Sequence, residues 1–291
     1  MIVPNRLPDV TAVAAHYDEL DPFYREVWGQ HVHHGYWASG RESPTEATAA
    51  LVALVAERLE LESGQEVCDI GCGYGATARL LAGQHQVRVT GVTVSAVQAA
   101  QAEPMPGVRI LVRDWLANGL ADASFDRAYA IESSEHMADK QGFFAEAMRT
   151  LRPGGRLVVC AWIAADAPAP WQVRHLLEPI CREGRLPGMG DEADYRRLAE
   201  AAGLEVVAVE DLSARVARTW SICARRVAWS LLTRPRYLRH LLSPAASDRV
   251  FALTLPRLIL AYRSRAMRYL LLVCKKPGEG ASPKAPVLPP G

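Results

Sequence analysis

The sequence predicts an α/β protein with a doubly wound, mostly parallel seven-stranded sheet and a helical cap over the active site. Two observations lead to this prediction. Between residues 60 and 162, short apolar runs alternate with segments of helical character, which is the pattern of parallel strands joined by crossover helices. A turn with three glycines, at 71–75, follows the first run, and polar residues follow the later ones. Such sheets bind ligands at the carboxyl ends of their strands, so we expect the functional site there.

The strands and helices follow from the order of these patterns along the chain. One strand ends directly before Gly71. Six more strands are expected at 87–93, 108–112, 125–131, 156–162, 205–209 and 269–274. Helices are expected at 10–30, 44–59, 76–82, 95–102, 143–151 and 191–202, and over most of 213–268. Ser43, with Glu46 three residues later, and Ser95 stand where helix N-caps are expected.

The chain is expected to divide into four parts. Residues 1–59 form N-terminal helices and a lid, residues 60–162 form the ligand-binding core, and residues 163–276 form a substrate cap with the remaining strands. The cap is expected to begin with an irregular stretch because prolines and glycines recur there. The tail, 277–291, is too rich in proline and glycine to fold and is expected to be disordered.

The bulk properties exclude several classes of protein. Hydrophobic residues make up 49% of the 291 residues, which is enough for a large buried core and excludes global disorder. The net charge is +1, from 33 basic and 32 acidic residues, which argues against a nucleic-acid-binding protein. The six cysteines are scattered without a CxxC motif, so we expect reduced thiols in a cytoplasmic protein. We expect no signal peptide, and no apolar stretch reaches the roughly 18 residues that a membrane span needs.

The turn after the first strand has the features of a site for a cationic ligand. Gly71, Gly73 and Gly75 allow a tight turn and let a ligand approach the backbone with no Cβ atom in the way. The helix that follows offers free backbone N–H groups to a polar ligand head. Asp69, just before the turn, suits a cation better than a pyrophosphate. An adenosine cofactor with an amino group and a sulfonium centre would fit, although the glycine spacing alone also occurs in dinucleotide-binding folds.

The segment at 31–37, HVHHGYW, concentrates three histidines and two aromatic residues. Three histidines in four positions could indicate a metal site, but no acid or cysteine accompanies them at ligand spacing, so no metal is expected. We interpret the segment as a loop whose polar and aromatic side chains line a substrate pocket. The candidate pocket residues are His33, His34 and Tyr36, together with Trp162 at the end of the fifth strand.

Taken together, these motifs resemble those of class I S-adenosylmethionine (SAM)-dependent methyltransferases. Within that superfamily the chain is most similar to the tocopherol methyltransferase type, which includes bacterial natural-product methyltransferases. The resemblance spans roughly residues 12–276 and implies the Rossmann-like methyltransferase fold, with SAM as cofactor and S-adenosylhomocysteine (SAH) as product. It rests on HVHHGYW at 31–37, VCDIGCGYG at 67–75, GVTVS at 91–95, RDW at 113–115, ESSEHM at 132–137 and LRPGGRL at 151–157.

The resemblance implies that the glycine turn holds the methionine part of SAM. The backbone of Gly71, Cys72, Gly73 and Gly75 would contact it, and Asp69 would support its amino group or order the loop. These assignments place the reactive end of the cofactor beside the carboxyl end of the first strand.

The resemblance also implies sites for the adenine and the ribose. Asp114 would accept a hydrogen bond from the adenine amine, with Trp115 beside the ring. Most class I enzymes bind the ribose hydroxyls with an acid at the end of the second strand, but here Thr93 stands there, followed by Val94, as is usual in this subgroup. A hydroxyl makes weaker hydrogen bonds than a carboxylate, so Gln98 is expected to help hold the ribose.

Methyl transfer from a sulfonium depends mainly on alignment and electrostatics. A base is needed where the acceptor keeps its proton until late, as phenols and activated ring carbons do. His136 is the candidate base because it follows the fourth strand and titrates near neutral pH, although it could instead be a structural link in its turn. Glu132 could contact the SAM amino group or polarise the acceptor, and Tyr17 is expected to close over the methionine end.

The cap carries an unusual charge. Between residues 213 and 268 there are 12 arginines and one acid, Asp248. Two interpretations stay open: solvated arginines whose stems cover apolar surface, or a surface that guides an anionic or membrane-associated substrate. The expected partner is a lipophilic or aromatic small molecule, with peripheral membrane contact as a further hypothesis and no nucleic acid. The chain is expected to act as a monomer or a homodimer.

Three functions remain as hypotheses. The leading one is a methyltransferase that acts on oxygen, nitrogen or carbon of a hydrophobic natural product in secondary metabolism. The second is a SAM-binding protein of the same fold that acts without methyl transfer, in cyclisation or regulation. The third is a nicotinamide-dependent oxidoreductase, against which the glycine spacing and Asp69 argue.

Overall fold

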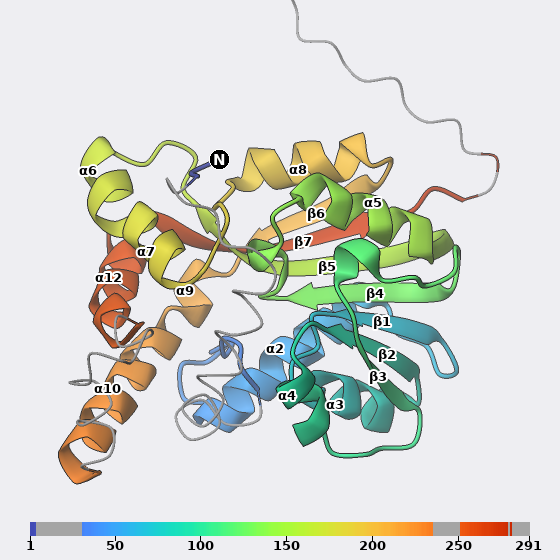
Figure 1. The fold of residues 1–291 in the computed structure, drawn as a ribbon, viewed down its shortest axis with the longest axis horizontal. Helices are drawn as coiled ribbons and strands as arrows, with labels where there is room; N and C mark the ends of the chain where they lie inside the picture. The colour runs from blue at the N-terminus through green and yellow to red at the C-terminus, as the bar shows by residue number, and fades with distance from the viewer. Residues whose placement is uncertain (4–30, 235–250, 279, 281–291) are drawn as a thin grey trace, which may run out of the picture.

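The computed structural model of the chain describes residues 1–3, 31–234, 251–278 and 280, with only the backbone of 251–253. The expected helices at 10–30, with Tyr17 among them, and nearly all of the expected disordered tail lie outside these described residues. The sheet and the helices that cover it lie within them (Figure 1).

A seven-stranded sheet forms the centre of the fold, which confirms the predicted architecture. Its strand order is β3-β2-β1-β4-β5-β7-β6. The neighbours from β3 through β5 pair in parallel, whereas β7 is antiparallel to both β5 and β6. The strands are β1 (Glu66–Ile70), β2 (Arg88–Thr93), β3 (Val108–Val112), β4 (Phe125–Ile131), β5 (Leu151–Ala164), β6 (Glu205–Asp211) and β7 (Met267–Lys275).

Helices cover both faces of the sheet (Figure 1). Helices α2 and α3 pack on one face, against β4, β5 and β2, while α5 and α8 pack against β5, β6 and each other on the opposite face. Their bounds, with that of the short helix after β2, are α2 (Pro44–Leu59), α3 (Ala76–His85), α4 (Ala96–Gln101), α5 (Lys140–Thr150) and α8 (Glu192–Ala201).

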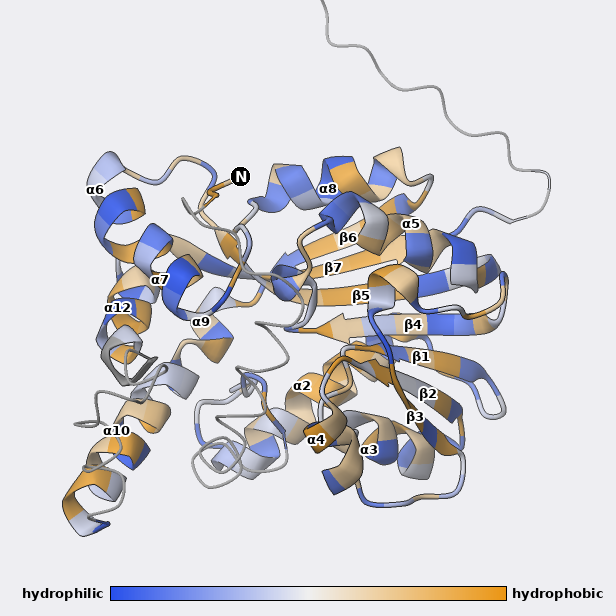
Figure 2. Ribbon diagram, viewed as in Figure 1, coloured by the Kyte–Doolittle hydropathy of each residue, from blue (hydrophilic) through white to orange (hydrophobic). Residues whose placement is uncertain are grey.

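The inner strands of the sheet are largely buried on both faces, as such strands usually are, and Figure 2 shows many hydrophobic residues along β5 and β7. Successive side chains of a strand point to opposite faces. In β5, Val158 and Cys160 therefore join the core under α2 and α3, while Leu157 and Val159 join the core under α5 and α8. The sheet thus separates two buried cores, and its exposed carboxyl edge is left for the site.

The predicted helix caps are confirmed. The Ser43 side chain accepts the Glu46 N–H at 3.3 Å, and the Glu46 carboxylate accepts the Ser43 N–H at 2.7 Å. The Ser95 hydroxyl accepts the Gln98 N–H at 3.0 Å. Helix α5 begins at Lys140, three residues earlier than expected, because Asp139 caps it.

Two other expectations need correction. Strand β5 begins at Leu151, five residues earlier than expected, because the LRPGG segment runs on in extended form beside β4 and β7. The first part of the cap is helical rather than irregular. Among its prolines, Pro170 stands in the first turn of a helical run over 170–183, where the missing N–H costs nothing, and Pro179 follows the π-helical turn Val173–Leu177 inside that run.

The described cap elements lie together on one side of the molecule (Figure 1). They are α6 (Pro170–Gln172), a π-helical turn (Val173–Leu177), α7 (Glu178–Glu183), α9 (Ser213–Val216), α10 (Arg218–Thr233) and α12 (Phe251–Arg263). Within the described residues, every helix is too short or too polar to cross a bilayer. All six cysteines of the sequence fall in the described ranges, unpaired and buried.

Candidate cofactor and active site

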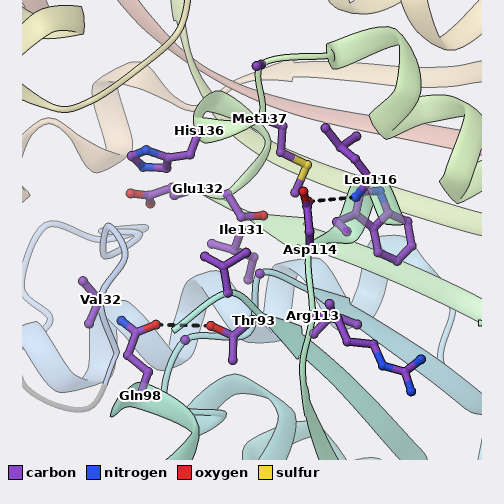
Figure 3. A pocket seen from close by; sticks show the side chains of 17 residues that line it. Val32, Thr93, Gln98, Arg113, Asp114, Leu116, Ile131, Glu132, His136 and Met137 are labelled. Atoms are coloured by element: carbon purple, nitrogen blue, oxygen red, sulfur yellow. Dashed lines mark hydrogen bonds between the residues drawn. The ribbon is translucent and has the colours of Figure 1, made fainter. Parts of the chain in front are cut away.

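The main cleft opens at the carboxyl ends of β1, β2 and β4, where the strand order reverses between β1 and β4. It encloses about 850 Å³, its open mouth included, which is the size of a small-molecule site. Figure 3 shows the side chains that point into it. The predicted site residues that line it are Gly71, Gly73, Thr93, Val94, Gln98, Asp114, Trp115, Glu132 and His136.

A smaller hollow of about 390 Å³ adjoins the main cleft and shares Val32, Gly71, Gly73 and Ile131 with it. The predicted site residues that line this second hollow, besides those two glycines, are Asp69, Cys72 and His33. The remaining predicted residues of the described ranges line neither space; they are Gly75, His34, Tyr36 and Trp162.

The three glycines of the turn have different reasons to be glycine. All have positive φ, at 84°, 53° and 68° in chain order. A Cβ on Gly71 would stand 2.3 Å from the Ser133 side chain, and one on Gly75 would stand 2.6 Å from Ile110. A Cβ on Gly73 would meet no atom closer than 3.9 Å. Gly71 is therefore required by packing, Gly75 is favoured mainly by its positive φ because the Ile110 methyl could move, and Gly73 is the glycine that leaves room for a ligand.

Asp69 offers an unpaired carboxylate oxygen to the second hollow. Its side chain is buried, and its Oδ2 has no hydrogen-bond partner among the described residues. Burial raises the pKa of Asp69 to about 7, and the nearby Tyr129 hydroxyl offsets only part of this increase. A buried carboxylate of this kind is stabilised by a cation. The position fits the ammonium group of the expected cofactor.

Thr93 and Gln98 form the wall of the cleft at the end of β2. The Thr93 hydroxyl donates to Gln98 Oε1 at 3.4 Å and accepts the Ser95 N–H at 3.2 Å. Figure 3 shows the Gln98 and Thr93 side chains directed toward one another in the cleft. The hydroxyl and the amide together present both donors and acceptors, which is what a ribose diol requires.

Asp114 stands at the end of the cleft beyond β3. Its Oδ1 accepts the Leu116 N–H at 3.0 Å and so caps the short 3-10 helix Trp115–Ala117. Figure 3 shows Leu116 and Met137 beside this carboxylate. The indole of Trp115 is buried and donates to the Phe143 carbonyl at 3.1 Å, so it anchors the turn. Leu116 and Met137 line this end of the cleft together with Trp115 and add apolar surface beside Asp114.

Glu132 lies at the end of β4 with both carboxylate oxygens engaged by the protein. Oε1 accepts the His34 N–H at 2.7 Å and the Tyr269 hydroxyl at 2.8 Å. Oε2 accepts the Trp162 indole N–H at 2.8 Å and lies 2.9 Å from Nδ1 of His34. Burial alone would raise the pKa of Glu132, but the contacts with His34 lower it to about 2. The backbone of Glu132 is left-handed, with φ of 54°, a strain that these contacts sustain.

Aromatic rings enclose the His34 side chain on several sides. The rings of Trp220 and Tyr269 have their centroids 4.9 and 5.0 Å from that of His34, and those of Trp162 and Tyr262 lie 5.8 and 6.0 Å away. His34 itself is fully buried. The structure thus places His34 and Trp162 in a network that joins the 31–37 segment to β4, β5, β7 and the cap. Tyr36 lies outside this network and packs against the adjoining core.

His136 is carried by the short 3-10 helix Ser134–His136, and it lines the main cleft (Figure 3). Two buried neighbours fix this turn. Glu135 accepts the Trp162 N–H at 2.7 Å, and Nζ of Lys140 donates to the carbonyls of Glu135 and Met137 at 3.2 and 3.1 Å. Burial raises the pKa of Glu135 to about 8. The imidazole is therefore presented from a rigid support.

The two other histidines of the segment face the second hollow. His33 Nδ1 donates to the His34 carbonyl at 2.8 Å, and His33 Nε2 lies 3.2 Å from His31 Nδ1. Burial lowers the pKa of His33, and burial together with His33 and Arg79 lowers that of His31 to about 4. Both rings are neutral near pH 7. Within the described ranges, no three His, Cys, Asp or Glu side chains are arranged to hold a metal ion.

Sequence reasoning missed several residues of the site. Tyr129 in the second hollow lies in an expected strand, where it resembles a core residue. Val32, Leu116 and Met137 in the main cleft lie in or directly after the quoted motifs, but as apolar residues they gave no signal of a role. Glu135 belongs to the ESSEHM motif, but nothing in that motif distinguishes its environment from that of Glu132. The Tyr269 contact joins positions 137 residues apart, and no local pattern predicts it.

Comparison with known proteins places the chain among SAM-dependent enzymes. A family model described as mycolic acid cyclopropane synthetase matches residues 5–230. The chloroplastic tocopherol O-methyltransferase of Arabidopsis thaliana is 29% identical, over 91% of this chain and 82% of its own length. The 27-O-demethylrifamycin SV methyltransferase of Amycolatopsis mediterranei is 32% identical, over 93% of this chain and 98% of its own length.

Solved structures share the fold. The (4+2)-cyclase SpnF superposes with a TM-score of 0.77 at 27% identity, over 95% of this chain and 98% of that one. A cyclopropane synthase from Mycobacterium tuberculosis superposes with a TM-score of 0.80 at 23% identity, over 94% of this chain and 100% of that one.

Proposed function

Because the chain belongs to the mycolic acid cyclopropane synthetase family and is a class I SAM-dependent methyltransferase, we propose that it methylates a hydrophobic natural product. The observation that carries this proposal is the order of polar groups along the main cleft and the hollow beside it: Asp69, then Thr93 with Gln98, then Asp114. That order matches the amino group, the ribose and the adenine of one extended cofactor.

In the proposed arrangement, each part of SAM meets a group with the complementary charge or hydrogen-bonding capacity. Asp69 binds the ammonium group, which gives its orphaned Oδ2 a partner. Thr93 and Gln98, with the backbone of Val94, bind the ribose, and Asp114 accepts from the adenine amine. The open space over Gly73 admits the methionine chain, and Cys72 lines it.

SAM supplies an electrophilic methyl group on its sulfonium. The protein has to align the acceptor with this group and take up the proton that the acceptor loses. We propose His136 as the group that takes this proton, because it lines the cleft on a turn that Glu135 and Lys140 hold in place. Glu132 is less suited to that task, since both of its oxygens are engaged and its pKa is lowered to about 2. We propose instead that Glu132 keeps the 31–37 segment against the cleft.

The acceptor is proposed to be lipophilic or aromatic and to carry the methyl group on oxygen, nitrogen or carbon. The names of two relatives support this class, since one acts on tocopherol and the other on a demethylrifamycin. An anionic group on the acceptor would suit the arginines of the cap. We also propose that the protein acts in the cytoplasm as a monomer or homodimer and that it makes peripheral contact with membranes.

A second candidate function has one specific observation in its favour. SpnF, whose fold this chain shares at 27% identity, is named as a (4+2)-cyclase. The chain could therefore bind SAM and act on its substrate without methyl transfer. The relatives named as methyltransferases favour the first function.

The two functions are separated by one experiment. The protein is incubated with SAM that carries a deuterated methyl group and with a panel of lipophilic phenols and polyketides, and the products are analysed by mass spectrometry. We expect a deuterated methyl group on at least one acceptor, with an equal amount of SAH formed. An isomerised product without label, made by protein that binds SAH, would instead support the cyclase.

A further inference from the structure

Helix α10 presents two large apolar side chains to solvent. Trp229 is 68% exposed and Leu232 is 82% exposed, and these are the highest values among the large hydrophobic side chains of the described residues. Figure 1 shows α10 extending away from the sheet at the edge of the molecule. Apolar side chains that are exposed in this way, on a protruding element, commonly mark an interaction surface.

The opposite face of α10 is firmly held. Trp220, Cys223 and Val227 are buried, in a core shared with α12. At the start of the helix, the Arg218 guanidinium lies 5.9 Å from the ring centroid of Trp37, and the Thr219 hydroxyl accepts the Gly35 N–H at 3.2 Å. The exposed side chains therefore belong to a helix that is already docked by one side.

Arg225 shares the outward side with the two apolar residues. Positions 225, 229 and 232 follow the i, i+4, i+7 spacing of one helix face, and all three side chains are exposed. We refer to Arg225, Trp229 and Leu232 as the outer face of α10. Figure 2 shows both hydrophilic and hydrophobic residues along this helix.

The charged residues of α10 all have one sign. The helix contains three arginines, at 218, 225 and 226, and no acid. Elsewhere on the molecule some arginines form ion pairs. Arg149 pairs with Asp122 and Glu146. Arg268 pairs with Asp211, Glu192 and Asp166. Helix α10 therefore carries a net positive charge, which complements an anionic partner.

We propose that the outer face of α10 docks on the surface of an anionic lipid bilayer. In this arrangement Leu232 enters the boundary of the acyl chains, Trp229 lies at the headgroup level, and Arg225 meets lipid phosphates. An acidic protein would satisfy the arginines but would not require a tryptophan and a leucine at the tip. This inference names the surface that makes the membrane contact proposed above, and it does not depend on which acceptor is methylated.

The test is vesicle sedimentation of the full chain, with SAH titration as an independent check of the cofactor site. We expect binding to vesicles of phosphatidylcholine with about one third phosphatidylglycerol, little binding to phosphatidylcholine alone, and a decrease as salt is raised. The double variant Trp229→Ser, Leu232→Ser should bind the anionic vesicles about tenfold more weakly, and Arg225→Glu should weaken binding too. All variants should keep their melting temperature and SAH affinity.

The matched control is Val112→Ser with Val207→Ser, which removes two exposed apolar side chains on the far strands β3 and β6. This control should bind anionic vesicles as the wild type does. The proposal is overturned if the wild type ignores anionic vesicles at low salt, or if the α10 double variant binds as tightly as the control. Equal binding to soluble polyglutamate, unaffected by loss of Trp229 and Leu232, would point to an acidic macromolecule and would also overturn it.

Discussion

The carboxylate of Glu132 lies 2.9 Å from the imidazole Nδ1 of His34, although 98 residues separate them in the chain. The contact ties the 31–37 segment to the end of β4, and Val32 from that segment then lines both the main cleft and the second hollow. A buried pair of this kind holds the wall of the cofactor site in place, and its loss should be felt in both stability and cofactor binding.

The first prediction compares the two glutamates of the ESSEHM motif. Glu132→Gln should lower the free energy of unfolding at pH 7 by about 3 kcal/mol, because an amide places N–H groups against four existing donors or cations. Glu135→Gln should change it by less than about 1 kcal/mol at pH 4 and should raise it at pH 7, since burial raises the pKa of Glu135 to about 8, Gln resembles the protonated acid, and only the wild-type unfolded chain is stabilised by ionisation of this group. Urea denaturation measures both.

The pH dependence of these two variants has opposite signs. The pKa of Glu132 is about 2 in the folded protein and near 4.5 in the unfolded chain. Its ionised carboxylate therefore stabilises the fold above pH 4.5, and this stabilisation is lost as the pH falls toward 2. The raised pKa of Glu135 makes the wild type lose stability as pH rises from about 4.5 to 8. Glu135→Gln should therefore become more stable than the wild type at pH 9. Equal effects of both substitutions at every pH would refute this account of the motif.

The second prediction concerns proton release when SAH binds. Burial raises the pKa of Asp69 to about 7, and the proposed ammonium contact requires the charged carboxylate. Binding at pH 6 should therefore release close to one proton, and affinity should fall about tenfold per pH unit below 7. Calorimetry in buffers of different ionisation enthalpy measures this release. Asp69→Asn should bind more weakly at pH 8 and show no such pH dependence; a pH-dependent Asp69→Asn would contradict the assignment.

The third prediction separates the glycines of the turn. Gly71→Ala should unfold or destabilise the protein by several kcal/mol, because its Cβ would stand 2.3 Å from Ser133 at a φ of 84°. Gly73→Ala has space and should cost only about 1 kcal/mol of backbone strain, yet it should lower SAH affinity at least tenfold. Thermal melting and calorimetry on both variants distinguish the two roles. A Gly73→Ala protein with unchanged affinity would remove the methionine chain from this position.

The fourth prediction concerns His136. Removing it should lower kcat by a factor of about 10² to 10⁴ for an acceptor that must lose a proton. The SAH affinity of His136→Ala should stay within about twofold of the wild-type value, because His136 is assigned to the acceptor side of the cleft. Steady-state kinetics across pH, with His175→Ala as a control histidine outside the cleft, provides the measurement. Full turnover by His136→Ala would exclude the base assignment.

Much of the cofactor edge could be predicted because its residues follow the ends of consecutive strands. Asp69, Thr93 and Asp114 each stand within two residues of a strand end, and parallel strands bring their carboxyl ends together. The helix caps at Ser43 and Ser95 were equally local and proved correct. Local patterns were enough wherever the interaction spans only a few residues.

The rest depended on contacts that no local pattern contains. Glu132 was expected at the pocket from its position after β4, and it lines the cleft, but its partners His34, Trp162 and Tyr269 come from three distant segments that the sequence does not connect. Trp115 was expected to flank adenine, and it does line the cleft, but the bond from its indole to the Phe143 carbonyl joins positions 28 residues apart and no local pattern predicts it. Prolines in the cap suggested irregular chain, although proline in the first helical turn is compatible with a helix.

A crystal structure of the protein with SAH bound tests the central claim most directly. We expect the adenine amine within hydrogen-bond distance of Asp114, the ribose hydroxyls at Thr93 and Gln98, and the amino group at Asp69, with the methionine chain over Gly73. A ligand bound in the reverse direction, or outside the cleft between the ends of β1 and β4, would contradict the account.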